Sequence, residues 1–94
     1  MKNNRTIQQK KIEVLNHLTT CCGIKTVGCR RANVGRTQFY EWQKIDAEFA
    51  FKVREIDLTF LDYVESNLIE MIHQKDRAAT MFYLKAKGRE RGYR

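Results

Sequence analysis

The sequence predicts an all-α fold, and three observations carry this prediction. The 94 residues include no proline, and the five glycines leave residues 36–87 without a residue that forces a break. No segment shows the strict apolar-polar alternation of a half-buried strand. No Asn-Gly or Asp-Gly hairpin signal occurs either. The length suits one compact domain, which excludes a two-lobed enzyme with a cleft between its lobes.

Residues 1–45 are expected to form a three-helix region that contains a helix-turn-helix. The first helix covers about residues 6–19, and Gly23 lies just beyond it, where a left-handed residue commonly ends a helix. The second covers residues 25–32 and stops at Asn33, since asparagine tolerates positive φ. A third helix covers residues 36–44. Two short helices joined by a three-residue turn are typical of a helix-turn-helix.

Residues 46–94 are expected to form an oligomerisation region, a helical hairpin with a basic tail. Asp46 can cap a long helix that extends to about His73, because its carboxylate can accept hydrogen bonds from the first free amides. Asp76 is the corresponding cap of a shorter helix that ends near Lys87. A long helix, a short turn and a short helix make an αα-hairpin.

The long helix carries two apolar stripes, where a surface helix needs only one. At 100° per residue the first stripe contains Phe49, Val53, Ile56, Phe60, Tyr63, Val64 and Met71. The second contains Ala47, Phe51, Leu58, Leu61, Ile69 and Ile72. Two stripes imply two packing partners, one of them a neighbouring subunit. The oligomer interface is therefore predicted at Leu58, Leu61, Ile69 and Ile72.

Charge is segregated along the chain, which has a net charge of +7. Residues 1–44 carry nine basic and two acidic side chains, residues 45–74 carry two and seven, and residues 75–94 carry seven and two. Two basic ends thus flank an acidic middle. A strongly basic first half is typical of a protein that binds nucleic acid, so residues 1–45 are the expected DNA-binding region.

The third helix is the candidate for reading double-stranded DNA. Phe39 and Trp42 are three residues apart and are expected to face the core. The outward groups then suit the base edges of the major groove; they are Arg36, Thr37, Gln38, Tyr40, Glu41 and Lys44. Phosphate contacts are expected from Lys25 and Thr26 at the start of the second helix, and phosphate or minor-groove contacts from Lys2, Arg5, Arg30 and Arg31. The alternative is an ordinary solvated helix face.

The residues offer little support for a zinc site, a phosphate-binding loop or catalysis. The spacing of His17, Cys21, Cys22 and Cys29 matches no common zinc pattern, so free thiols are expected. The run beginning at Gly35 lacks the lysine of a phosphate-binding loop. We therefore expect no catalytic residue, no metal, no cofactor and no enzymatic activity. No secretory signal or membrane-length apolar run is found, which predicts a cytoplasmic protein without a membrane partner.

The run TVGCRRANVGRTQFYEWQKIDAEFA, residues 26–50, resembles the homeodomain-like helix-turn-helix of phage terminase small subunits. The positions that match the family pattern are Val34, Tyr40, Trp42, Asp46, Phe49 and Ala50. The run YLKAKGRERGYR, residues 83–94, is similar to the end of such proteins. The chain departs from the family at Asn33, where glycine is usual, at Gly35, where a serine cap is usual, and at Gly28-Cys29, where small alanines are usual.

The resemblance implies a non-catalytic subunit that recognises viral DNA for genome packaging. Such subunits form homo-oligomers, often rings, and present the DNA to a separate large terminase subunit, an ATPase and nuclease, in the host cell cytoplasm. One alternative is a transcriptional regulator of phage or prophage origin that uses the same helix-turn-helix as a dimer. A further alternative is an interaction protein whose basic ends bind acidic protein surfaces.

Overall fold

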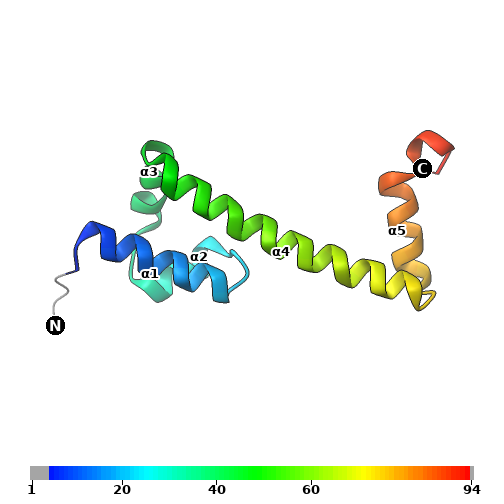
Figure 1. The fold of residues 1–94 in the computed structure, drawn as a ribbon, viewed down its shortest axis with the longest axis horizontal. Helices are drawn as coiled ribbons and strands as arrows, with labels where there is room; N and C mark the ends of the chain where they lie inside the picture. Colours follow the sequence, from blue (N-terminus) through cyan, green and yellow to red (C-terminus); the bar gives the residue numbers. More distant parts are fainter. Residues whose placement is uncertain (1–4, 94) are drawn as a thin grey trace. The chain divides into compact units, whose positions relative to one another are not determined.

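The computed structural model describes residues 5–93, and this part of the chain is all-α, with no strand (Figure 1). Short connections join the five α-helices. The elements are α1 (Ile7–Thr20), α2 (Lys25–Ala32), α3 (Arg36–Ile45), α4 (Ala47–His73), α5 (Arg77–Lys87) and the 3₁₀ helix η1 (Arg89–Arg91). The predicted helices are confirmed, with bounds that differ by at most one residue.

The helix ends follow from local hydrogen bonding and backbone conformation. The Thr6 hydroxyl accepts from the Gln9 amide, and the Gln9 side chain accepts from the Thr6 amide, which forms a capping box before α1. Cys22 and Gly23 adopt φ of 63° and 78° after α1, and Asn33 adopts φ of 58° after α2. The left-handed stops predicted at Gly23 and Asn33 are therefore confirmed.

The chain divides into two compact units between Phe60 and Leu61, and we call them unit 1 and unit 2. Helix α4 contributes its first half to unit 1 and its second half to unit 2. Unit 1 thus extends past the boundary expected at residue 45. The reason is packing, because Phe49 and Val53 of α4 complete the core that α1, α2 and α3 begin.

The core of unit 1 draws on every one of its helices. Its buried members are Val14, Leu18, Cys21, Cys29, Ala32, Val34, Phe39, Trp42, Phe49 and Val53. The Phe49 ring meets those of Phe39 and Trp42 edge to face, at centroid distances of 5.3 and 5.6 Å. The prediction that Phe39 and Trp42 face the core is confirmed.

The two apolar stripes of α4 are buried far less than their periodicity suggests. In the first stripe, Phe49 and Val53 are buried and Ile56 is half-buried. The remaining members are exposed, namely Phe60, Tyr63, Val64 and Met71. The second stripe is exposed except for Ile72, which is half-buried. Most of the stripe surface of α4 is therefore not covered within the chain.

Unit 2 consists of the second half of α4, α5 and η1. Asp76 caps α5 as predicted, since its carboxylate accepts from the Ala79 amide at 2.8 Å. Ala79 is the one buried residue among residues 61–93. A cavity of about 490 Å³ lies between α4 and α5, with walls that include Leu61, Ile69 and Phe82. Unit 2 has almost no core of its own.

Gly28 allows α1 and α2 to approach closely. A Cβ added there would lie 2.6 Å from Cδ2 of Leu18, whose side chain is fully buried. Overpacking typically costs about 1 to 3 kcal/mol, more than the roughly 1 kcal/mol by which alanine favours a helix over glycine. We expect Gly28→Ala to lower the melting temperature. Gly35→Ala is the matched control, because nothing lies within 4 Å of the added Cβ; equal melting of the two variants would contradict the close approach.

Candidate nucleic-acid interface

Helix α3 has one buried face and one polar face. Phe39 and Trp42 anchor the buried face in the core of unit 1. The six side chains predicted to read DNA are all exposed; they are Arg36, Thr37, Gln38, Tyr40, Glu41 and Lys44. Tyr40 is 50% exposed, and its ring packs edge to face on Phe39 at 5.3 Å. A polar surface that offers donors, acceptors and one aromatic ring therefore rests on a rigid apolar base.

The turn before α3 sets the start of this surface. The Val34 side chain is buried, and its amide donates to the Cys29 carbonyl at 2.9 Å, so the turn is held against α2. Gly35 caps α3 with extended backbone and provides no side-chain hydrogen bond. The first amides of α3 consequently lack a side-chain cap, and Arg36 is exposed beside them. This end of α3 favours anions through its amides and its dipole.

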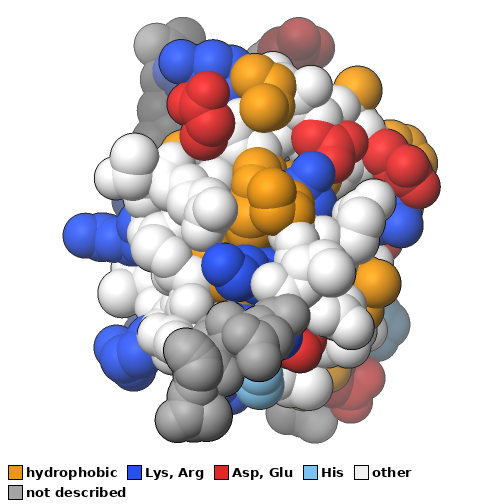
Figure 2. All heavy atoms as spheres, turned by 90° about the vertical axis from the view of Figure 1, so that its left-hand side faces the viewer, with side chains coloured by type: hydrophobic (Ala, Val, Ile, Leu, Met, Phe, Trp, Pro, Cys, Tyr) orange, Lys and Arg blue, Asp and Glu red, His pale blue; other side chains and the backbone are white. Residues whose placement is uncertain are grey.

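The charges at this end of the molecule are mixed. Figure 2 views the side of unit 1 that lies at the left of Figure 1, and Lys and Arg side chains are spread over it among uncharged groups. Asp and Glu side chains gather in the upper part of the view. Hydrophobic side chains also reach the surface between them. The face is therefore no uniform basic patch, and a DNA contact here would depend on where individual cations lie.

The other predicted phosphate contacts differ in their surroundings. Thr26, Arg30 and Arg31 are exposed on α2, with both arginines in its last turn, where they also stabilise the carboxyl end of the helix. Arg5 is half-buried, forms an ion pair with Glu13 and donates to the Asn33 carbonyl at 3.5 Å. Lys2 lies outside the described residues. The structure thus ties Arg5 to the turn before α3.

Lys25 is held by a carboxylate of the same unit. Its ammonium donates to both oxygens of Asp57 on α4, at 2.9 and 2.8 Å. The same carboxylate lies close to Gly23, where an added Cβ would come within 2.7 Å of Oδ1. The connection between α1 and α2 is therefore fastened to α4. A phosphate would have to compete with Asp57 for Lys25.

A second ion pair fastens α1 to the junction of α3 and α4. Lys11 Nζ donates to Asp46 Oδ2 at 2.6 Å and lies 5.5 Å from the centroid of the Trp42 ring. The Phe49 amide donates to Asp46 Oδ1 at 3.1 Å, which confirms Asp46 as the cap of α4. Both hydrogen bonds favour the ionised carboxyl, that of Lys11 more strongly, and they lower the pKa of Asp46.

The lowered pKa of Asp46 predicts a loss of stability in acid. The Asp46 carboxyl takes up its proton at a lower pH in the folded protein than in the unfolded chain, where the aspartate pKa is about 3.9. The stabilisation is complete above that pH and disappears as the pH falls through the lower folded value. We expect the unfolding free energy of Asp46→Asn to decline less steeply below about pH 4 than that of the parent. Urea titrations from pH 2 to 7 measure this; parallel curves would contradict it.

Two of the three cysteines form part of the core. Cys21 and Cys29 are buried, Cys22 is exposed, and all three are free thiols, as predicted. Burial raises the pKa of the Cys29 thiol, against an opposing effect of Arg36. Within residues 5–93 no three His, Cys, Asp or Glu side chains are grouped as a metal site requires. No helix in this part combines the length and apolar character needed to span a membrane.

Sequence reasoning missed the ion-pair partners of Lys11 and of two predicted DNA contacts, Arg5 and Lys25. Glu13, Asp46 and Asp57 each hold a basic side chain of unit 1. Lys11 and Asp46 are 35 residues apart, and Lys25 and Asp57 are 32 apart. No local spacing signals contacts at such separations. Comparison with protein-family models, curated proteins and solved structures found no match.

Proposed function

We propose that this chain binds double-stranded DNA through a helix-turn-helix formed by α2 and α3. The observation that carries the proposal is the two-faced α3, which buries Phe39 and Trp42 and exposes six groups suited to base edges or phosphates. The short turn at residues 33–35 between α2 and α3 supports this proposal, because two short helices joined by a three-residue turn are typical of a helix-turn-helix. The short turn and the buried Val34 side chain hold α2 and α3 close together.

We further propose that the protein acts as a terminase small subunit, an oligomer that recognises viral DNA and hands it to a large ATPase and nuclease subunit. This step rests on the resemblance of residues 26–50 and 83–94 to that family. The exposed apolar side chains of unit 2 support the proposal that the protein is an oligomer. A helix pair with one buried residue gains little stability from its own packing. In this account α4 and α5 form the helical hairpin that carries the subunit contacts.

The DNA-binding step is tested with variants of the exposed face of α3. Arg36→Ala and Gln38→Ala are expected to weaken binding to a specific site by about 1 to 3 kcal/mol each, the usual value of a good base contact. Arg54→Ala on α4 is the matched control for loss of one exposed cation. Fluorescence anisotropy with labelled duplex DNA measures the affinities. Equal affinities for the parent and both α3 variants would contradict a reading role for α3.

The oligomeric state separates the terminase proposal from a transcriptional regulator. Both would bind duplex DNA through α3. A dimer that binds a palindromic site is the usual arrangement of a helix-turn-helix regulator, whereas a packaging ring contains many subunits. Light scattering that gives eight or more subunits would favour the ring. A stable dimer on a two-fold symmetric site would favour the regulator.

A further inference from the structure

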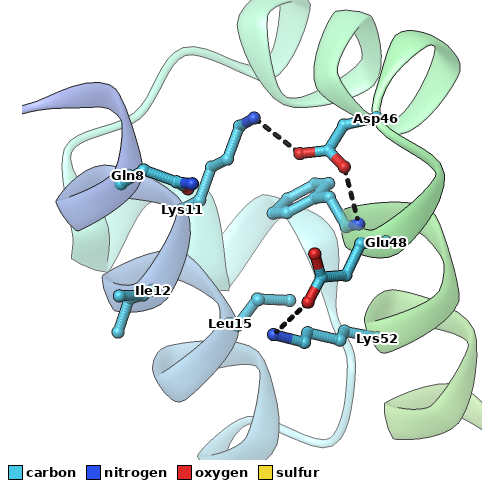
Figure 3. A pocket seen from close by; sticks show the side chains of 8 residues that line it. Gln8, Lys11, Ile12, Leu15, Asp46, Glu48 and Lys52 are labelled. Atoms are coloured by element: carbon cyan, nitrogen blue, oxygen red, sulfur yellow. Dashed lines mark hydrogen bonds and ion pairs between the residues drawn. The ribbon is translucent and has the colours of Figure 1, made fainter.

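A groove runs along unit 1 between α1 and the first half of α4. Two adjoining cavities of about 340 and 350 Å³ form it, and both are lined by Ile12, Leu15 and Lys52. Figure 3 shows the first of them. On α1 the lining extends from Gln8 to Thr19, which corresponds to roughly 16 Å of helix at 1.5 Å per residue. The DNA-binding proposal makes no use of this groove.

The floor of the groove is apolar and its α4 edge carries charge. Leu15 points from α1 toward α4, and Ile12, which is 57% exposed, lies one turn before it (Figure 3). Phe49 and Ile56 supply the floor from α4. Such a groove matches the apolar side of one further helix, which would insert side chains at spacings of three and four residues.

The α4 edge presents two carboxylates. Glu48 and Glu55 both line the groove and are seven residues apart, roughly 10 Å along the helix. Lys52 lies between them and pairs with Glu48 at 3.4 Å. On the other side of the groove Lys11 is already held by Asp46 at 2.6 Å. A helix that enters the groove would therefore gain most from cations spaced by about two turns.

Helix α5 has that pattern. Met81 and Phe82 are 49% and 62% exposed. Arg77 and Lys85 stand four residues before and after Met81, so they share its side of the helix and lie roughly 12 Å apart. The complementarity also holds for longer segments, since residues 75–94 carry seven basic and two acidic side chains and residues 45–74 carry two and seven.

We propose that α5 of a second copy of this chain docks in the groove of unit 1, with Met81 and Phe82 on its floor and Arg77 and Lys85 beside Glu55 and Glu48. This inference rests on the oligomeric part of the proposed function and names the surfaces that meet. The contact joins two different surfaces of identical subunits. Head-to-tail contacts of this kind form a ring where the rotation between subunits closes and an open filament where it does not, whereas a contact of one surface with itself gives only a pair.

A mixing experiment tests this head-to-tail contact separately from the hairpin contact predicted at Leu61 and Ile69. Ile12→Glu places a charge in the groove and leaves α5 intact, and Met81→Glu does the reverse. Each variant alone is expected to be monomeric by light scattering, because each lacks one of the two surfaces. An equimolar mixture is expected to give a one-to-one heterodimer and nothing larger. Ile7→Glu is the matched control, since Ile7 is 55% exposed on the same helix and lines neither cavity.

The proposal is overturned if Ile12→Glu or Met81→Glu assembles as the parent does, or if the mixture stays monomeric. A parent that is monomeric at tens of micromolar overturns it too. Circular dichroism confirms that the variants are folded. Binding of duplex DNA by the same variants tests the DNA-binding proposal separately from the docking proposal. If the monomeric Ile12→Glu variant binds DNA, α3 can bind DNA without assembly of the subunits. A parent that assembles as described and binds no DNA would contradict the proposed function and leave the docking contact in place.

Discussion

Replacing Trp42 with alanine is expected to lower the free energy of unfolding by about 3 to 5 kcal/mol, the usual cost of truncating a large buried aromatic residue. Trp42 is 5% exposed, packs on Phe49 and lies beneath the Lys11 ammonium. Its loss would open a cavity where α1, α3 and α4 meet. Because small domains are stable by only about 5 to 15 kcal/mol, such a loss would remove a large part of the total free energy of unfolding.

Tyr40→Ala is the control for this substitution, because it removes an aromatic side chain from the exposed face of the same helix. We expect its unfolding free energy to stay within about 1 kcal/mol of the parent value. Urea unfolding followed by circular dichroism measures both variants. A Trp42→Ala protein that unfolds with the parent midpoint would show that α3 is not anchored by this side chain.

Replacing Leu61 and Ile69 together with glutamate is expected to weaken the oligomer, because we expect this side of the hairpin to form a subunit contact in addition to the one between α5 and the groove of unit 1. Both side chains are exposed in unit 2 and line its cavity. In an assembled state their burial against a neighbour would leave each new carboxylate without a partner, which is costly, whereas in a monomer the charges would be solvated. Helix content should change little, because both residues lie on an exposed side of α4.

Sedimentation velocity at tens of micromolar measures the effect of the two changes. Glu65→Gln with Ser66→Ala is a suitable control, since it alters the same stretch of α4 without adding charge to an apolar surface. An oligomer indifferent to the double glutamate change would show that the subunits meet elsewhere. A monomeric parent would remove the support that unit 2 gives to a ring.

Local chemistry allowed the helix ends to be predicted. Asn33, Asp46 and Asp76 act as stop or cap through hydrogen bonds and backbone angles that depend on a few neighbouring residues. The burial of Phe39 and Trp42 followed from their spacing of three residues on a short helix. These features are encoded within single turns of helix, so one sequence suffices to find them.

Contacts between distant segments could not be predicted in the same way. The pairs Lys11–Asp46 and Lys25–Asp57 depend on how α1, α2 and α4 pack, and no periodicity within one helix contains that information. The apolar stripes of α4 show the same limit of prediction from sequence. Periodicity identifies apolar faces, but it does not tell whether a face is covered within the chain or by another chain, as the exposed Leu61 and Ile69 illustrate.

The salt dependence of DNA binding tests the central claim most directly. Each phosphate neutralised by a lysine or arginine releases counterions, so the logarithm of the binding constant should fall linearly with the logarithm of salt concentration, by about 0.9 per contact. We predict a steep slope for the parent and a slope reduced by about one for Arg30→Ala, which removes an exposed predicted phosphate contact. A binding constant that is the same at low and at physiological salt would contradict a DNA-binding role for this chain.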